Sequence, residues 1–579
     1  MHLKSINIIS YISLILLISF EGCSSSNKNQ NLVAAGFENV RIEGELSTRM
    51  NKNFDRLEEE IYQPQNLFVT EKESIGWPGD KEGRTILGLV MDARASHRAP
   101  KYLDEIIRML PAHFNTRGYM GNIGSGSVDE QQLAGNGWLL RGLNEYYEWT
   151  NDTTVLALSK MIIDSLFIPI TPYLKDYPIT EESRISGAGA MSGTILNSVG
   201  KWAVSSDIGC VFIAMDGIIH AYKNNPEPAT KLLIDELITL FLKVDLLKIK
   251  AQTHSSLTGM RGLIRYATIT GDRKLIHEVE KRWTLYKAYG MTENYENYNW
   301  FGRYDTWTEP CAIIDAYMVA VQLWENTGNA KYLEDAEMIY WNGIAITQRS
   351  NGGFGCDKCV GPLSNKLAVH VYEAYWCCTM RGGEGLARAA EYSCYTGENR
   401  IVIPFYRTGS LELIDKGINI SQDTRYPFGN RVTLTLNQMP DREISISLFI
   451  PTYMQVKKLS LNGNTLTPEI TNSFLTIKSK FKPGDRIIMD YLFDMKWVAT
   501  NSKEITASHL KKALYGPLIL GYSGETPAKI KTGSRILQAG EKEFYIEGTD
   551  YRLVPLYHLL DPVVSDHTGY QREVLFRMD

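Results

Sequence analysis

The stretch Leu139-Leu-Arg-Gly-Leu-Asn-Glu-Tyr-Tyr-Glu-Trp149, followed by Thr150-Asn151-Asp152, decides the fold of this chain. Its apolar residues recur at the three- and four-residue spacing of an amphipathic helix. Asn151 suits the left-handed conformation that ends a helix, and Asp152 suits the cap of the next one. The stretch therefore predicts a helix that ends at this mark and a second helix directly after it.

The same arrangement recurs over the first two thirds of the chain. Residues 231–242 and 313–324 have helical spacing, and marks of the same kind stand at Thr270-Gly271-Asp272, Thr327-Gly328-Asn329 and Thr396-Gly397-Glu398. Because the four marks are irregularly spaced, a solenoid of fixed period is excluded. We expect helical hairpins stacked around a ring, an (α/α)6-type barrel over residues 53–400. Its long loops, 184–205 and 290–309, are where function usually lies.

The pattern changes near residue 401. Short β-rich or alternating segments follow, separated by Gly, Pro, Asn and Asp, at residues 401–404, 409–414, 431–436, 443–450 and 474–477. Asn462-Gly463-Asn464 is a tight hairpin signal. We expect a β-sandwich over residues 401–500 and a second small β-domain over 501–579, separated by a break at 500–508. The chain is thus predicted to be a multidomain α+β protein.

The N-terminus has the features of an export signal. Lys4 precedes a mostly apolar run over residues 6–20, which is too short to span a membrane comfortably. Gly22-Cys23 followed by three serines resembles a bacterial lipoprotein cleavage site. We expect a signal peptide over residues 1–23 and a tether and N-terminal segment over 24–52. Cys23 would carry the lipid anchor, at the periplasm, the outer membrane or the cell surface.

Composition excludes some functions and leaves others open. A length of 579 residues predicts several domains, and 44% hydrophobic with 22% charged residues is typical of a soluble globular protein. The net charge of -5 is slightly acidic, whereas nucleic-acid-binding proteins usually carry an excess of basic residues. The 32 tyrosines and 11 tryptophans suit a sugar-binding enzyme, and equally suit a large helical core.

Apart from Cys23, seven cysteines remain, an odd number that argues against a fully paired disulfide framework. Cys377 and Cys378 are adjacent, and a disulfide between them would close a strained ring. Upstream, Glu309-Pro310-Cys311 brings a carboxylate and a thiol within reach of one ion. One carboxylate and three thiolates are ligands that zinc accepts, so we predict a zinc site on Glu309, Cys311, Cys377 and Cys378.

A second pair, Cys356-Asp357-Lys358-Cys359, competes with this interpretation. It predicts first a disulfide or loop staple in an oxidising compartment. The alternatives are a redox pair, or a structural four-cysteine zinc site shared with Cys377 and Cys378.

The order of motifs resembles glycoside hydrolase family 127, the β-L-arabinofuranosidases once grouped as a domain of unknown function. The resemblance spans about residues 138–407. It rests on Glu-x-Cys, Thr-Gly-x-x-x-Tyr, Ala-Glu-x-x-x-x-Asn and Cys-Cys, which here are Glu309-Pro310-Cys311, Thr327-Gly328 with Tyr332, Ala336-Glu337 with Asn342, and Cys377-Cys378.

The resemblance implies a zinc-dependent retaining mechanism in which Cys377 attacks the anomeric carbon as a thiolate. Glu309, Cys311 and Cys378 would be the other ligands. The acid/base would be Glu293 or Glu296, both shortly before the Glu-x-Cys motif. β-L-Arabinofuranosyl or related plant-glycan linkages would be the substrate.

Further residues match substrate-contacting positions by their order. His254 resembles the family's sugar-facing histidine, and Glu337 resembles a carboxylate that binds furanose hydroxyls. Four aromatic residues are candidates for stacking on sugar, at least half of them expected to be packing residues: Tyr295, Tyr298, Trp300 and Trp307. Pro310, the rewritten loop 290–309 and the pair Cys356 and Cys359 depart from the family pattern.

Two rival functions use the same features differently. A polysaccharide lyase or an unsaturated-uronyl hydrolase on an α/α barrel would leave Cys377-Cys378 unexplained. A non-catalytic glycan-binding lipoprotein would keep the aromatic residues but would need neither the thiols nor Glu293 and Glu296. Both the hydrolase and its rivals predict an oligosaccharide or polysaccharide partner.

Overall fold

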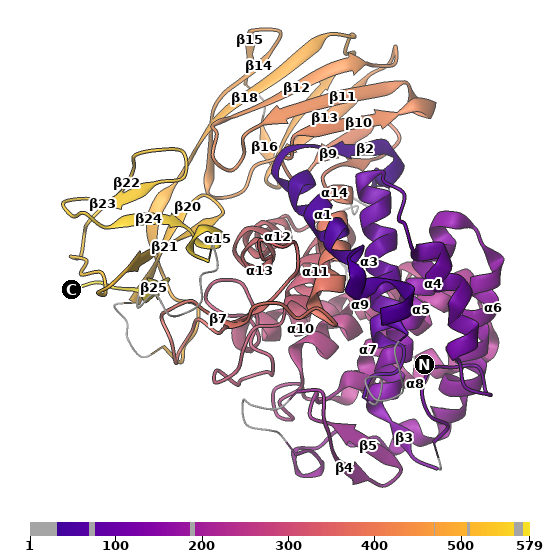
Figure 1. Ribbon diagram of the computed structural model, residues 1–579. Helices are drawn as coiled ribbons and strands as arrows, with labels where there is room; N and C mark the ends of the chain where they lie inside the picture. The colour runs from indigo at the N-terminus through magenta and orange to yellow at the C-terminus, as the bar shows by residue number, and fades with distance from the viewer. Residues whose placement is uncertain are drawn as a thin grey trace, which may run out of the picture.

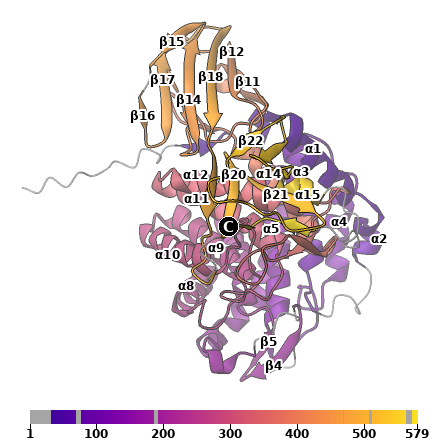
Figure 2. The same cartoon turned by 90° about the vertical axis from the view of Figure 1, so that its left-hand side faces the viewer.

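The computed structural model describes residues 32–68, 76–124, 126–185, 192–467, 469–505, 510–560 and 571–579. The predicted signal peptide and Cys23 lie outside these residues. A helical domain lies below a β-sandwich in Figure 1, and a third, C-terminal sheet lies against its flank. The turned view in Figure 2 shows the same arrangement, with the C-terminal sheet in front of the helices.

Six helices form a closed inner ring within the described residues, each packing against the next. They are α3 (Asp80–Ser96), α5 (Glu130–Thr150), α7 (Ile213–Asn224), α9 (Thr253–Thr270), α11 (Pro310–Thr327) and α14 (Cys378–Glu391). An outer helix packs on each in turn: α4 (Leu103–Met109), α6 (Thr153–Ile162), α8 (Pro228–Lys243), α10 (Arg273–Tyr289), α12 (Lys331–Ile339) and α1 (Gly44–Leu57). The predicted (α/α)6 barrel is confirmed. It starts at Gly44 rather than at 53, because α1 closes the outer layer over α14.

The inner ring is narrow because its helices touch backbone to backbone at glycines. A Cβ atom added at Gly83 of α3 would lie 2.3 Å from the amide nitrogen of Leu139 on α5. One added at Gly217 of α7 would lie 2.2 Å from the carbonyl oxygen of Gly137 on α5. Any larger side chain at these positions would force neighbouring helices apart.

Three of the four predicted helix ends are present. Asn151, Gly271 and Gly328 end α5, α9 and α11 in the left-handed conformation, with φ of 59°, 75° and 72°. The fourth prediction was wrong. Helix α14 ends at Glu391, and Tyr395–Thr396 form strand β8, which pairs with β9 (Arg400–Ile403) around Gly397. The same Thr-Gly pair therefore makes a strand turn here.

The sandwich consists of a six-stranded and a seven-stranded sheet, in the orders β1-β8-β9-β13-β17-β16 and β15-β14-β18-β12-β11-β10-β2. Its remaining strands are β10 (Gly409–Leu413), β11 (Ile418–Thr424), β12 (Arg431–Gln438), β13 (Ile444–Phe449), β14 (Met454–Leu461), β15 (Asn464–Leu466), β16 (Ile470–Thr471), β17 (Phe474–Ser479) and β18 (Asp485–Phe493). The hairpin predicted at Asn462-Gly463 joins β14 to β15, with both residues at positive φ.

The N-terminal segment contributes to this sandwich. β1 (Val33–Ala34) pairs with β8, and β2 (Val40–Ile42) pairs with β10. Residues assigned to a tether and N-terminal segment thus supply an edge strand to each sheet. Their shortness hides them in the sequence, because two or three residues show no alternation.

The C-terminal sheet starts at β19 (Met495–Ala499), ahead of the break predicted at 500–508. Its other strands are β20 (Leu510–Tyr515), β21 (Leu518–Gly524), β22 (Ile536–Gln538), β23 (Phe544–Ile546), β24 (Arg552–Pro555), β25 (Gln571–Glu573) and β26 (Phe576–Arg577). Smaller pieces on the barrel are α2 (Pro64–Leu67), α13 (Ala345–Thr347), α15 (Leu556–Leu559), β3 (Val128–Asp129), β4 (Ile195–Val199), β5 (Trp202–Ser205), β6 (Cys356–Lys358) and β7 (Ala368–Val371).

One helical run in the described residues, Thr153–Asp176, is long and apolar enough to cross a membrane by length and composition alone. It contains α6, which packs on α5, and a turn that packs on α8. The run is therefore accounted for by the outer layer of the barrel.

Candidate active site

The predicted zinc ligands meet at one end of the barrel, where inner helices begin. Glu309 is the N-cap residue of α11 and Cys311 lies in its first turn, while Cys377 is the N-cap residue of α14 and Cys378 is its first residue. Pro310 suits the first helical position, where its missing N–H costs nothing. The positive ends of two helix dipoles thus face these four side chains.

The distances within this thiol cluster (Cys311, Cys377 and Cys378) are short. Cys311 Sγ lies 3.5 Å from Cys377 Sγ and 3.7 Å from Cys378 Sγ, and the two adjacent sulfurs are 3.7 Å apart. Glu309 Oε1 lies 3.9 Å from Cys377 Sγ. The three thiols form a group able to hold a metal ion, and Glu309 forms a second such group with Cys311 and His254, so the four predicted ligands lie close together.

Arg84 supplies a positive charge to this cluster. Its Nη1 donates to Cys377 Sγ at 3.0 Å and to Cys311 Sγ at 3.1 Å, and Asp80 holds the same guanidinium at 2.8 Å. Hydrogen bonds from Cys311 and Cys378, followed by the charges of Arg84 and His254, hold the pKa of Cys377 well below its usual range.

The three thiols are not equivalent. Burial raises the pKa of Cys311 and that of Cys378 well above the usual range. Cys377 is also the only one of the three with partial solvent exposure. Because the thiolate is the reactive form, Cys377 is the most reactive thiol of the cluster.

His254, predicted to face the sugar, lies in the first turn of α9 and is buried. Its Nδ1 is 3.0 Å from Glu309 Oε1 and its Nε2 is 3.6 Å from Asp315 Oδ2, while its ring stacks on Trp138 at 5.8 Å between centroids. With Glu309 and Cys311 it forms a second possible ligand group. His254 therefore lies at the thiol cluster, as a direct neighbour of the predicted ligand Glu309.

Glu293 is bound elsewhere. Its carboxylate accepts hydrogen bonds from Lys512 Nζ at 2.8 Å and from the backbone nitrogens of Asn501 and Ser502 at 2.9 and 2.7 Å. All three donors belong to the C-terminal domain. The acid/base role predicted for Glu293 does not fit this position, because its carboxylate clamps that domain to loop 290–309.

Glu296 is fully buried beside Asp357. Burial, followed by the charge of Asp357, raises the pKa of Glu296 well above its usual range. Asn294 donates to its Oε2 at 2.7 Å. The next residue, Asn297, accepts the backbone N–H of Glu309 at 2.7 Å, so Glu296 adjoins the residue that orients a ligand.

Glu337 lies between the barrel and the sandwich. Arg407 donates to its Oε1 at 2.7 Å and Trp341 to its Oε2 at 3.0 Å. The predicted sugar contact does not fit this position, because both carboxylate oxygens are already bonded inside the protein. Of the four aromatic candidates, Tyr298 and Trp300 are buried packing residues, whereas Tyr295 and Trp307 are only partly buried.

The pair Cys356 and Cys359 does not form the predicted disulfide, since all seven described cysteines are free. The thiol of Cys356 is hydrogen-bonded to Cys378, whereas that of Cys359 donates to the carbonyl oxygen of Asn297 at 3.5 Å. The two side chains therefore serve different neighbours, one of them in the thiol cluster.

Sequence reasoning missed several residues of the site. One of them is Asp207, which is buried. Its burial, followed by the charge of Glu309, raises the pKa of Asp207 to about 7, and the charge of Cys377 acts in the same direction. Asp80, Arg84 and Trp138 were missed as well. They lie on α3 and α5, far from the cysteine motifs in the chain, and only the closed ring brings them together.

The Glu293 clamp predicts a stability effect. Replacing Lys512 by methionine would leave a buried carboxylate without its cation, at a cost of about 3–5 kcal/mol in the free energy of unfolding. Lys511→Met is the matched control, because Lys511 is the neighbouring lysine and its side chain is only partly buried. This substitution should change the free energy of unfolding by less than about 0.5 kcal/mol. Denaturant unfolding followed by tryptophan fluorescence measures both, and equal effects would contradict the clamp.

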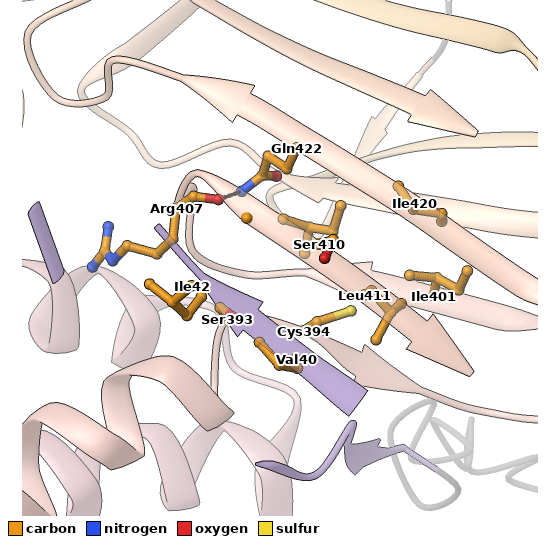
Figure 3. Close-up of a pocket in the computed structure, with 12 residues that line it drawn as sticks. Val40, Ile42, Ser393, Cys394, Ile401, Arg407, Ser410, Leu411, Ile420 and Gln422 are labelled. Atoms are coloured by element: carbon orange, nitrogen blue, oxygen red, sulfur yellow. Dashed lines mark hydrogen bonds between the residues drawn. The ribbon is translucent and has the colours of Figure 1, made fainter. Parts of the chain in front are cut away.

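A separate cavity lies between the two sheets of the sandwich, and Figure 3 shows the residues that line it. It is lined by Val40, Ile42, Cys394, Leu411, Ile420 and Gln422, among others, and holds about 30 Å³. This is room for about one water molecule. The cavity is a packing gap away from the thiol cluster, since its walls are strands β2, β10 and β11.

The comparisons with known proteins agree on one family. No curated protein matches this sequence. Among solved structures, "The GH127, Beta-arabinofuranosidase, BT3674" shares 16% identity with this chain, with a TM-score of 0.69 over 95% of this chain and 98% of that one. A GH127 β-L-arabinofuranosidase from Geobacillus stearothermophilus T6 shares 13% identity, with a TM-score of 0.65 over 93% and 100% of the two chains.

Two sequence families match along the chain. Residues 400–495 match "Beta-L-arabinofuranosidase, GH127 middle domain", and residues 83–391 match "Beta-L-arabinofuranosidase, GH127 catalytic domain". The second match alone covers more than half of the 579 residues. It runs from Gly83 in α3 to the end of α14 and contains every residue of the thiol cluster. This chain therefore belongs to glycoside hydrolase family 127 and is a glycoside hydrolase.

Proposed function

We propose that this protein is a zinc-dependent retaining glycosidase whose nucleophile is the Cys377 thiolate. The observation that supports this most strongly is the convergence of three thiols and a carboxylate at the N-terminal ends of α11 and α14. Membership of a glycoside hydrolase family favours hydrolysis over the lyase and binding-only alternatives.

The spacing of the ligands fits zinc. Tetrahedral zinc with Zn–S bonds of about 2.3 Å places its sulfur ligands about 3.8 Å apart. The three sulfur–sulfur distances are 3.5, 3.7 and 3.7 Å. Zinc bound by Glu309, Cys311, Cys377 and Cys378 would keep the thiols deprotonated. Arg84 offsets part of the negative charge that three thiolates and a carboxylate gather.

The chain's own residues then carry the two steps of retention. Cys377 Sγ forms a bond to the anomeric carbon while the glycosidic C–O bond breaks and a carboxylic acid gives its proton to the leaving oxygen. In the second step the same carboxylate takes a proton from water, the water oxygen bonds to the anomeric carbon, and the C–S bond breaks. The sugar leaves with its original anomeric configuration.

The proton donor must hold its proton near neutral pH. Asp207 and Glu296 meet this requirement, because burial raises the pKa of both carboxyls. Glu293 is less suitable because Lys512 and two backbone N–H groups occupy its carboxylate. We therefore place the acid/base role on Asp207 or Glu296.

We propose β-L-arabinofuranosyl linkages, or related linkages of plant glycans, as the substrate. The support is the family match and the named activity of the structural relatives. We also propose that the protein is exported and anchored through a lipid on Cys23, on the basis of its N-terminal sequence. A periplasmic or surface location would give access to such glycans.

The test combines metal analysis with product analysis. Purified protein should contain about one zinc per chain, and removal of zinc by a chelator should abolish release of arabinose from β-L-arabinofuranosides until zinc is restored. Proton NMR of the first-formed sugar should show retained configuration. An active protein without stoichiometric zinc, or an inverted product, would refute the mechanism.

The same assay separates the two acid candidates. Asp207→Asn or Glu296→Gln, whichever removes the acid, should reduce release from an oligosaccharide far more than release from a 4-nitrophenyl glycoside. The nitrophenolate leaves without protonation, so its release depends less on the acid.

A further inference from the structure

A hollow of about 540 Å³ is lined by the two residues that precede Cys377 in the chain, and it takes part in none of the steps described above. One wall is formed by Tyr375 and Trp376, which directly precede Cys377. The facing wall comes from α1, the turn after it and α2, through Arg56, Glu59, Glu60, Ile61 and Asn66. Two residues that line the hollow thus directly precede the proposed nucleophile in the chain, and the hollow is open to solvent.

The aromatic wall is fixed in place. Tyr62 donates from its hydroxyl to the carbonyl oxygen of Tyr375 at 2.7 Å, and its ring meets Trp376 edge to face at 5.4 Å. Arg56 binds both carboxylate oxygens of Glu373, at 2.9 and 3.1 Å, and Thr379 donates to the same carboxylate. The segment on either side of Cys377 is therefore anchored, and the rings form a preformed surface.

Trp376, which lines the hollow, is followed directly by Cys377 of the thiol cluster. Lys81 Nζ lies 5.2 Å from the centre of the Trp376 ring. Its neighbour Asp80 binds Arg84, which donates to Cys377. A ligand group on the aromatic wall therefore lies next to a group held at the thiols.

The chemistry of the walls suits a sugar ring. Tyr375 is 44% exposed, so its ring is accessible to a ligand, and it meets Trp376 edge to face at 5.9 Å between ring centroids. Two aromatic faces offer an apolar platform for the C–H face of a sugar, and the side chains of Arg56, Glu60 and Asn66 offer donors and acceptors for its hydroxyls. Charges of both signs on the rim favour a neutral sugar over an anion.

We propose that this hollow is a second sugar subsite, which binds the residue of an oligosaccharide adjacent to the one cleaved at Cys377. This inference rests on the proposed function for the position of the cleaved sugar. It predicts that the enzyme prefers oligosaccharides over single-residue glycosides, with Tyr375 as the main contact.

The experiment compares a β-arabinofuranosyl tetrasaccharide with methyl β-L-arabinofuranoside, which has no residue adjacent to the cleaved one. In Tyr375→Ala, the loss of kcat/KM on the tetrasaccharide should exceed the loss on the methyl glycoside by about tenfold, mostly through KM. Trp376→Phe keeps an aromatic face and should show a smaller difference. Trp149→Ala is the control, because Trp149 is an exposed tryptophan at the C-terminal end of α5, remote from the helix starts that form the site.

Equal losses on both substrates in Tyr375→Ala would overturn the subsite while leaving the proposed function intact. If the unaltered protein hydrolyses neither substrate, the proposed function fails, and calorimetric binding of the tetrasaccharide decides the subsite separately. A tenfold weaker affinity in Tyr375→Ala than in Trp149→Ala would then support it. The same affinity in both variants would overturn it.

Discussion

Replacing Cys377 by alanine is expected to lower kcat about 10,000-fold or more, because the variant lacks the proposed nucleophile that attacks the anomeric carbon. Loss of a catalytic nucleophile costs up to about a millionfold in enzymes with covalent intermediates. Cys377 is the thiol with the lowered pKa and with solvent access, so neither Cys311 nor Cys378 can replace it. The measurement is arabinose release under saturating substrate.

Two controls separate the loss of the nucleophile from damage to the protein. Cys394→Ala removes a thiol that lines the cavity in Figure 3, and it should keep activity within a few-fold of the unaltered protein. Burial raises the pKa of Cys394 to about 12, so that thiol has no chemical role at neutral pH. Cys377→Ser offers a weaker nucleophile of similar size. Substantial activity in a well-folded Cys377→Ala protein would remove Cys377 from the mechanism.

The fold was predictable where its signals are local. The helix ends at Asn151, Gly271 and Gly328 follow from left-handed residues and polar caps, and these need only a few neighbouring residues. The helix end predicted at Thr396-Gly397 was wrong, because the same residue types also form a turn between strands. Only the pairing with Arg400–Ile403 decides between a helix end and a strand turn. β1 and β2 were not predicted for a related reason, since their partner strands lie some 360 residues away along the chain.

The closeness of Glu309 to the three thiols was predictable because few residue types bind metal ions. Thiols and a carboxylate near one another in a few motifs indicate a metal, and the structure brings these four side chains together. Carboxylates carry no such restriction. Glu293 and Glu337 became clamps between domains, which depends on Lys512 and Arg407 in other domains. Arg84 and Asp207 lie outside any motif, so only the three-dimensional arrangement identifies them.

Below the site, the barrel contains a buried ionic network that supports His254. Asp315 of α11 accepts hydrogen bonds from Arg261 at 2.8 Å, from Arg381 at 2.5 Å and from Thr258 at 2.7 Å. Burial alone would raise the pKa of Asp315, but Arg381 and Arg261 outweigh it and hold the pKa below its usual range. The stabilising charge is therefore complete at neutral pH and is lost only as the pH falls through that lowered value.

Asp315→Asn is expected to reduce the free energy of unfolding by about 3–5 kcal/mol at pH 7, because it removes one of the buried carboxylates that neutralise Arg261 and Arg381 and leaves Glu384 shared between them. The matched control is Asp164→Asn, whose partner Lys160 is exposed, as Asp164 is. Exposed pairs contribute at most about 1 kcal/mol. Denaturant unfolding at pH 7 measures both variants. A loss in Asp315→Asn no greater than in Asp164→Asn would mean that hydrogen bonds hold the network and charge does not.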